Sequence, residues 1–201
     1  MPVHRGNIGE VVLSAWNDAV APLIKCSTQQ ETNRERSRAW IRSLAERFRE
    51  HYEGDRYRVF SLGNKKNREQ FGLNELLFDL AVCSVSSTKS LERQPRDLPF
   101  IARCHWQIES EFSRQNTRDL IVDMSKLVMG AAENKLFVAS HRGDRERDVL
   151  DQCAPIAACC GGRVHFCFVS HPDVWENDPE SPVLHEWIAG GWVEVAVSAA
   201  R

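Results

Sequence analysis

Apolar and polar residues repeat along the chain with two periods, one typical of helices and one typical of strands. From about Thr28 to Tyr52, apolar residues recur every three or four positions opposite a run of arginines and glutamates, which predicts a long amphipathic helix. Further helical patterns cover 8–25, 117–132 and 144–160. Short apolar runs that suit a pleated sheet predict strands at 57–62, 75–83, 104–112, 136–140, 164–170 and 192–198.

The order of these elements predicts the fold class. Helices and strands alternate through most of the chain, which indicates an α/β protein with three layers, α/β/α, and a central mixed β-sheet. Loops are expected at 63–68, at the polar, proline-containing segment 86–99, and in the proline-rich stretch after residue 170. A chain of 201 residues is long enough for one buried core, and a single domain over 1–201 is expected.

Charge, cysteine content and hydropathy limit the partners and the cellular location that the sequence allows. The formal net charge of −2 provides no overall attraction to a polyanion, so nucleic-acid binding requires a local basic patch. The seven cysteines lack the spacing of a zinc site and lie mostly in apolar segments, as expected for reduced thiols. No apolar stretch reaches membrane-spanning length and no secretory signal pattern opens the chain, so a cytoplasmic location without a membrane partner is expected.

Two predicted strands carry acidic side chains among apolar ones. The first contains Glu75 and Asp79, and the second contains Glu109 and Glu111. Alternation along a strand places each pair on one face, so up to four carboxylates meet if the strands are neighbours. Crowded, partly buried carboxylates need a cation or a shared proton, which indicates a metal site. The alternatives are solvent exposure for the glutamates and, for Asp79, a structural hydrogen bond or an ion pair with an arginine.

The stretch 106–112, followed by 123–128 and preceded by a strand with a lone Asp79, resembles the PD-(D/E)XK restriction-endonuclease-like superfamily in a Glu-Xaa-Glu form. The resemblance covers about 28–170 and leaves 171–201 as a C-terminal extension with a final strand. It rests on the order of elements more than on the individual letters. It implies a restriction-endonuclease-like core and a Mg²⁺-dependent endonuclease, with Mn²⁺ as a substitute, that hydrolyses the phosphodiester bonds of DNA.

The resemblance also assigns roles to individual residues. Asp79 and Glu109 would be the metal-binding acids, and Glu75 would be an additional metal ligand. Glu111 stands where the family usually has a catalytic lysine, and it would bind a water or act as general base. Lys126 on the following helix is the candidate for the missing positive charge; the alternative is that it is a solvated helix residue.

The partner is expected to be DNA, contacted by the basic loop residues Lys65, Lys66 and Arg68. The arginines of the long helix are a second candidate surface, although the interleaved glutamates favour a solvated face with internal ion pairs. Cutting both strands would suit a homodimer. The alternative function is a catalytically inactive nuclease-fold protein that binds nucleic acid or a protein partner. A third hypothesis is a structural subunit whose carboxylates pair with arginines.

Overall fold

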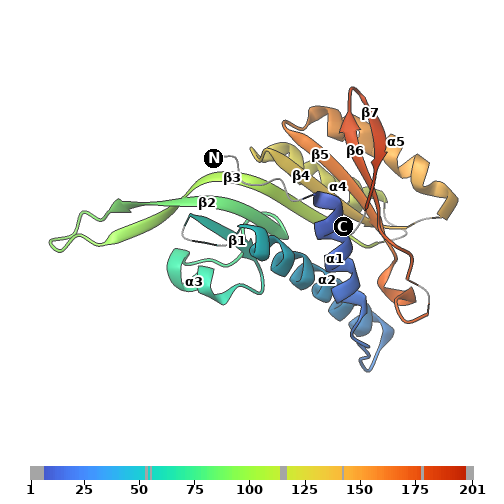
Figure 1. Cartoon of the computed structure of the whole chain (residues 1–201), viewed down its shortest axis with the longest axis horizontal. Coiled ribbons are helices and arrows are strands. Elements are labelled where there is room, and N and C mark those ends of the chain that lie inside the picture. The colour runs from blue at the N-terminus through green and yellow to red at the C-terminus, as the bar shows by residue number, and fades with distance from the viewer. Residues whose placement is uncertain are drawn as a thin grey trace.

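The structure is a computed structural model that describes residues 7–52, 54, 56–113, 117–141, 143–177 and 179–197. In this part of the chain, five α-helices flank one mixed sheet of seven strands (Figure 1). The helices are α1 (Ile8–Val20), α2 (Gln29–Tyr52), α3 (Lys65–Phe71), α4 (Thr117–Met129) and α5 (Glu146–Cys159). The strands are β1 (Tyr57–Ser61), β2 (Leu80–Lys89), β3 (Asp97–Glu111), β4 (Asn134–Ser140), β5 (Arg163–Val169), β6 (Val183–Ile188) and β7 (Gly191–Val195). The predicted α/β class with a mixed sheet is confirmed.

The strands lie in the sheet in the order in which they follow one another along the chain. β1, β2 and β3 form an antiparallel meander, β4 and β5 run parallel to β3, and β6 and β7 return antiparallel. Each parallel step is made through a helix, α4 before β4 and α5 before β5, as parallel neighbours require. Leu80 pairs with Ile108, so the two strands next to the acidic residues are neighbours.

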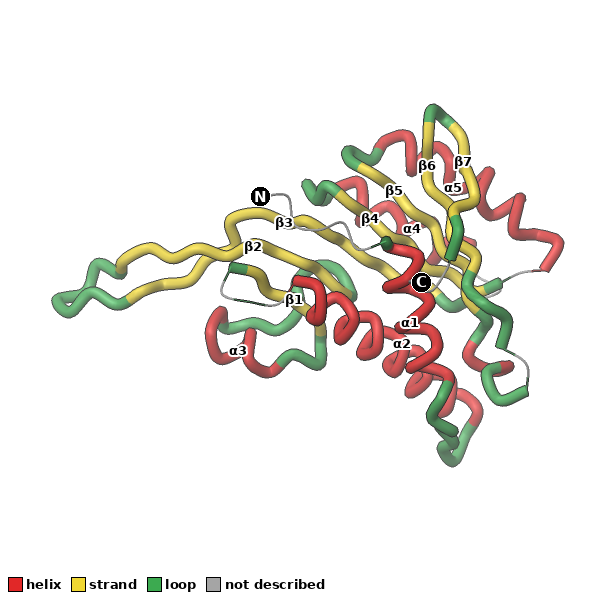
Figure 2. The backbone as a smooth tube through the Cα atoms, in the orientation of Figure 1, coloured by secondary structure: helices red, strands yellow, loops and turns green. Residues whose placement is uncertain are grey.

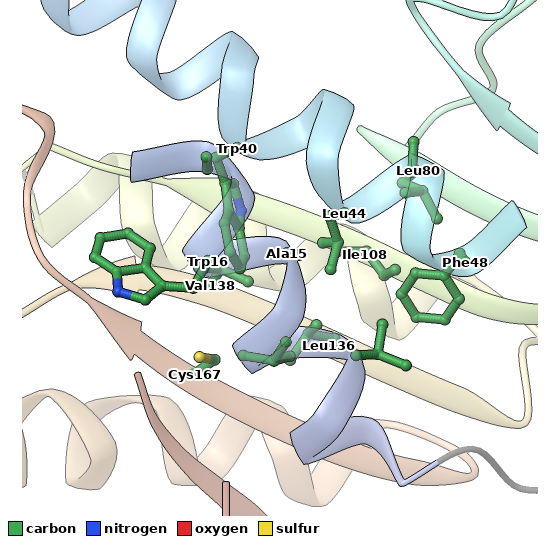
Figure 3. Close-up of a cluster of buried hydrophobic side chains, with 14 of the residues drawn as sticks. Ala15, Trp16, Trp40, Leu44, Phe48, Leu80, Ile108, Leu136, Val138 and Cys167 are labelled. Atoms are coloured by element: carbon green, nitrogen blue, oxygen red, sulfur yellow. The ribbon is translucent and has the colours of Figure 1, made fainter. Parts of the chain in front are cut away.

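One face of the sheet packs against α1 and α2 (Figure 3). Trp40 and Leu44 of α2 and Ala15 of α1 are fully buried there, against Ile108 and Leu136 of the sheet. The helical period of the apolar residues in α2 explains this arrangement, because it gathers them into one stripe that faces the strands. The polar residues of the helix, including most of its arginines, are therefore directed away from the sheet.

The opposite face is covered by α4 and α5 (Figure 1). Leu120, Met124 and Leu127 of α4 are buried against Phe137 and Phe166 of β4 and β5. Side chains that alternate along these strands therefore enter two separate cores, one on each face. The three-layer arrangement follows from this, because the central strands are apolar on both faces and need a helical layer on each.

The hairpin formed by β2 and β3 is longer than the apolar runs that predicted it. Segment 86–99 was predicted as a loop, but β2 continues to Lys89 and β3 begins at Asp97. Figure 2 shows that this part of the hairpin extends away from the helices. Its side chains are mostly exposed, so the sequence carries no burial pattern there. The prediction was wrong because cross-strand backbone hydrogen bonds, and not burial, form this part of the ribbon.

Segment 63–68 is also not a loop, because α3 begins at Lys65. Asn64 and Asn67 each donate a side-chain hydrogen bond of 2.9 Å to the backbone oxygen of Val59, which fixes the short helix to β1. Gly72 ends the helix with a φ of +78°, a conformation that favours glycine. These tertiary bonds stabilise a helix that is too short and too polar to show a helical period.

Two strand boundaries also differ from the prediction. β2 begins at Leu80, so Glu75 and Asp79 lie in an irregular segment before the strand and do not share a strand face. β6 lies inside the stretch predicted as a loop, and only Leu184 of that strand is fully buried, which leaves no apolar run to detect. The final predicted strand corresponds to β7, and Ser198 lies outside the described residues. No helix among the described residues is long and apolar enough to span a membrane.

The turn between α5 and β5 depends on Gly162, which has a φ of +81°. A Cβ atom there would lie 2.4 Å from the backbone oxygen of Glu133. We expect Gly162→Ala to lower the free energy of unfolding by about 2 kcal/mol, measured by urea denaturation. Gly161→Ala is the matched control, because a Cβ at that position meets nothing within 4 Å. Equal stability of the two variants would contradict this account of the turn.

Candidate functional site

Asp79 immediately precedes β2 and lies beside the last residues of β3. Its Oδ2 accepts a hydrogen bond of 2.9 Å from the backbone N–H of Ser110, the residue between the two glutamates of that strand. Burial raises the pKa of Asp79 to about 6, although the Ser110 N–H and the charge of Lys126 both favour the ionised form. The hydrogen bond from the backbone thus fixes the position of the Asp79 carboxyl next to β3, although burial disfavours its ionised form.

Glu109 is the most buried acid of the site, with 2% of its surface exposed. It lies on β3 and points towards α4, where Lys126 Nζ donates a hydrogen bond of 3.1 Å to its Oε2. Its Oε1 is buried and has no hydrogen-bond partner within the described part of the chain. Burial, followed by the charge of Asp79, raises the pKa of Glu109 to about 8. A buried carboxylate oxygen without a partner is costly, and a cation would satisfy it.

Lys126 points from α4 towards the carboxylates. Its Nζ lies 3.1 Å from Glu109 Oε2 and 2.8 Å from Asp123 Oδ1, and 31% of its side chain remains exposed. Burial by itself would lower the pKa of Lys126, but its hydrogen bonds to Asp123 and Glu109 raise the pKa above its ordinary value. The amine is therefore a permanent positive charge at the edge of the site.

The remaining two acids lie around this pair. Glu111 ends β3; burial raises its pKa, a hydrogen bond from the Ser113 N–H opposes the rise, and a contact with the carboxyl of Asp123 adds to it. Glu75 lies in the segment before β2, and burial raises its pKa against the charge of Lys126. The contact with Asp123 disfavours the ionised form of Glu111, since two ionised carboxylates in contact repel each other.

The four carboxylates do not meet at one point. Among the residues that the structure describes, no three Asp, Glu, His or Cys side chains are placed to hold one metal ion. Asp79 and Glu109 form a pair within this group of acids, because the negative charge of Asp79 raises the pKa of Glu109. Mg²⁺ is commonly bound by one or two carboxylates and keeps several waters, so this pair of hard oxygen donors fits it. The unpartnered Oε1 of Glu109 is the atom that a cation would satisfy.

The structural-subunit hypothesis requires ion pairs between these carboxylates and arginines. In the described part of the chain neither Asp79 nor Glu109 pairs with an arginine, and the cationic partner of Glu109 is Lys126. Several arginines of α2 instead pair with other carboxylates. Buried Arg36 contacts Glu176 and donates to the backbone oxygen of Pro172 at 2.6 Å, which joins α2 to the C-terminal segment. The basic residues predicted to contact DNA are exposed on α3, namely Lys65, Lys66 and Arg68.

Sequence reasoning missed Asp123 as a member of the site. Asp123 precedes Lys126 by three positions, a spacing that places both on one side of α4. This spacing, together with the buried stripe of the same helix, could have identified Asp123. The arginines of the long helix were predicted as a second candidate surface, and three of them line a cavity with Asp79, namely Arg34, Arg38 and Arg42.

Comparison of the chain with protein-family models and with curated proteins finds no match. The class of site is therefore defined by its residues alone. The half-buried carboxylate of Asp79, directly before β2, lies beside the end of β3, which carries the buried Glu109. Lys126 from the next helix bonds to Glu109, in an α/β protein with a mixed sheet.

Proposed function

We propose that the protein is a metal-dependent phosphodiesterase that hydrolyses DNA, with Asp79 and Glu109 as the ligands of Mg²⁺ or Mn²⁺. The observation that carries the proposal is the carboxylate of Glu109, buried beside Asp79, with one oxygen bound to Lys126 and the other without a partner among the residues that the structure describes. A carboxylate pair of this kind is costly to the fold, and metal binding explains why it is present.

The proposal includes a restriction-endonuclease-like core. Support for it comes from the order of elements, in which α2 is followed by the meander of β1, β2 and β3, then by α4 and the parallel strand β4. Support also comes from the place of the acids, with Asp79 directly before β2 and Glu109 on β3. Both are features that the resemblance implies.

The residues of the site have separate roles in the proposed reaction. Bound Mg²⁺ would lower the pKa of a water and neutralise charge on the phosphate. Asp79 and Glu109 hold the ion, and Glu75 is the additional acid beside them. Lys126 keeps a positive charge next to Glu109, where it stabilises the negative charge that develops on the phosphate. Glu111, with its raised pKa, accepts a proton from the attacking water.

The direct test is cleavage of supercoiled plasmid DNA. We expect the protein to produce nicked circles with Mg²⁺ or Mn²⁺ and none in excess EDTA, because the ion held by the two carboxylates would activate the attacking water and neutralise charge on the phosphate. Restoring Mg²⁺ after chelation should restore nicking. Nicking that continues in excess EDTA would show that a different chemistry is responsible.

The second candidate is a catalytically inactive nuclease-fold protein that binds DNA or a protein partner. The observation that favours it is Lys126, which already lies between Glu109 and Asp123 and neutralises part of their charge without a metal. This candidate requires salt-dependent DNA binding without cleavage at any metal concentration. It also requires that substitution of Lys65 and Lys66 by alanine weakens that binding.

A further inference from the structure

A cavity of about 310 Å³ lies between α2 and the segment that carries Asp79. Three kinds of side chain line it. Arginines from α2 line one part, Glu75 and Asp79 line another, and Ile41, Leu62 and Phe112 contribute apolar surface. Asp79 thus belongs both to this cavity and to the carboxylate pair with Glu109 on β3. Whatever occupies the cavity is therefore next to the proposed metal site.

The arginines of the cavity form a regular row. Arg34, Arg38 and Arg42 follow one another at intervals of four residues, which is about 6 Å along a helix, so they project from one side of α2. Arg34 and Arg42 form no ion pair within the described part of the chain. Arg38 pairs only with Glu35 on the same helix, and half of its side chain is exposed.

Other arginines of α2 are engaged in the fold. Arg47 pairs with Asp18 and Glu50, and Arg49 pairs with Glu46. The row that borders Asp79 is therefore different from the solvated, internally paired face that the interleaved glutamates predicted. Arg34 and Arg42 keep their guanidinium groups available, and the exposed pair between Arg38 and Glu35 is weak, so a row of this kind is suited to bind consecutive phosphates of a strand.

The apolar part of the cavity indicates what accompanies those phosphates. Its volume is at the lower end of the ~300–1,000 Å³ range of small-molecule pockets, so it holds one nucleoside and not a base pair. Phe112 offers an aromatic ring, and Ile41 and Leu62 offer aliphatic surface, of the kind against which an unpaired base stacks. A base inside a duplex is stacked and paired, and cannot enter.

We propose that this cavity binds one unpaired nucleotide next to the scissile phosphate, with Arg34, Arg38 and Arg42 on the adjoining phosphates, so that the substrate is single-stranded DNA. The inference rests on the proposed function for the place of cleavage, and it adds the form of the substrate. It also moves the main phosphate contact from α3 to α2.

The test measures binding apart from cleavage. Fluorescence anisotropy with a short labelled single strand and its blunt duplex, in Ca²⁺ instead of Mg²⁺, should show about tenfold tighter binding of the single strand, as expected for one stacked base. The triple variant Arg34→Ala, Arg38→Ala and Arg42→Ala should weaken single-strand binding at least tenfold. It should also reduce the slope of log affinity against log salt by about 2, since each phosphate contact in a single strand contributes about 0.7.

Two control variants sharpen the result. The triple variant Lys65→Ala, Lys66→Ala and Arg68→Ala removes the same charge from the neighbouring helix, and it should change single-strand affinity less than about threefold. Ser37 also lines the cavity, so Ser37→Phe should fill it and weaken single-strand binding without any change of charge. Circular dichroism establishes that each variant is folded.

The outcomes separate this inference from the proposed function. Equal affinity for single strand and duplex, equal effects of the two triple variants, or full affinity in folded Ser37→Phe would each overturn the inference. If metal-dependent cleavage is found but the arginine row has no effect on affinity, the inference fails and the proposed function stands. If the row and the cavity control single-strand binding but neither plasmid nor single-stranded DNA is cleaved with Mg²⁺ or Mn²⁺, the proposed function fails and the binding site stands.

Discussion

Substituting Glu109 by glutamine should abolish metal-dependent cleavage and, in the metal-free protein, remove most of the loss of stability that occurs as the pH rises from about 4.5 to 8. Cleavage should fall by about 10³-fold or more, because a bound metal contributes several kcal/mol to such a reaction and its ligand would be lost. Glutamine keeps the shape of the side chain but not its charge, so the loss of cleavage measures the contribution of the negative charge of Glu109. Asp79→Asn should cause a loss of similar size.

The effect on stability follows from proton binding. The pKa of Glu109 is about 8 in the folded protein, against 4.5 for an ordinary glutamate. Between these values the folded protein holds a proton that the unfolded chain has released, so the free energy of unfolding falls as the pH rises from about 4.5 to 8. At about 1.4 kcal/mol per pKa unit, the fall is on the order of 5 kcal/mol. Glu109→Gln cannot ionise and should lose this dependence.

Asp79 makes the same kind of contribution over a lower range. Its pKa rises from 3.8 to about 6, so the free energy of unfolding should fall between those values for the same reason. Glu109→Gln should therefore retain the smaller decline, between about pH 3.8 and 6, and Asp79→Asn should retain the larger decline, between about pH 4.5 and 8. The two variants separate the two overlapping contributions to one pH profile.

Thermal denaturation in EDTA across pH 4–9, combined with plasmid nicking, measures both effects. Added Mg²⁺ should raise the melting temperature of the unsubstituted protein at pH 8 and leave Glu109→Gln unchanged, because only the former retains both ligands. Glu92→Gln is the matched control, since Glu92 is exposed on the hairpin and pairs with Arg96. Nicking at the original rate in Glu109→Gln would show that this carboxylate is not part of the active site.

Substituting Lys126 by methionine should reduce cleavage by about 10²–10³-fold, the cost of removing one group that stabilises charge in a transition state. Affinity for single-stranded DNA should change little, because Lys126 does not line the arginine cavity. Lys126 also favours the ionised form of Glu109, so its loss should raise the pKa of that carboxyl further. Remaining cleavage should consequently need a higher pH, since Glu109 must be ionised to bind the metal.

The pH profile of cleavage, measured together with DNA affinity, separates this role from a structural one. Lys126→Arg keeps the charge and should restore part of the rate, while Lys89→Met removes an exposed lysine of the hairpin and should have no effect. A loss of stability in Lys126→Met without any change in nicking would show that the lysine only neutralises carboxylates and takes no part in cleavage.

The amphipathic helix α2 and the buried strands on both sides of the site were predictable because each leaves a periodic apolar pattern. Asp79 and Glu109 were recognisable for the same reason, since a carboxylate stands out in an apolar run. The outer part of the β2–β3 hairpin and strand β6 were missed because few of their side chains are buried. Pairing between strands stabilises them, and such pairing leaves little trace in the order of residues.

The sequence by itself determined the α/β class, a mixed sheet between two helical layers, and the carboxylates that stand in apolar runs, because burial is encoded in the spacing of apolar residues. Only the tertiary structure decided which charges meet. It placed Asp79 on the Ser110 N–H, directed Lys126 to Glu109, moved Glu111 towards Asp123, and brought one row of α2 arginines to the Asp79 cavity. Electrostatic interactions depend on distances in space between residues far apart in the chain, and no local pattern specifies those distances.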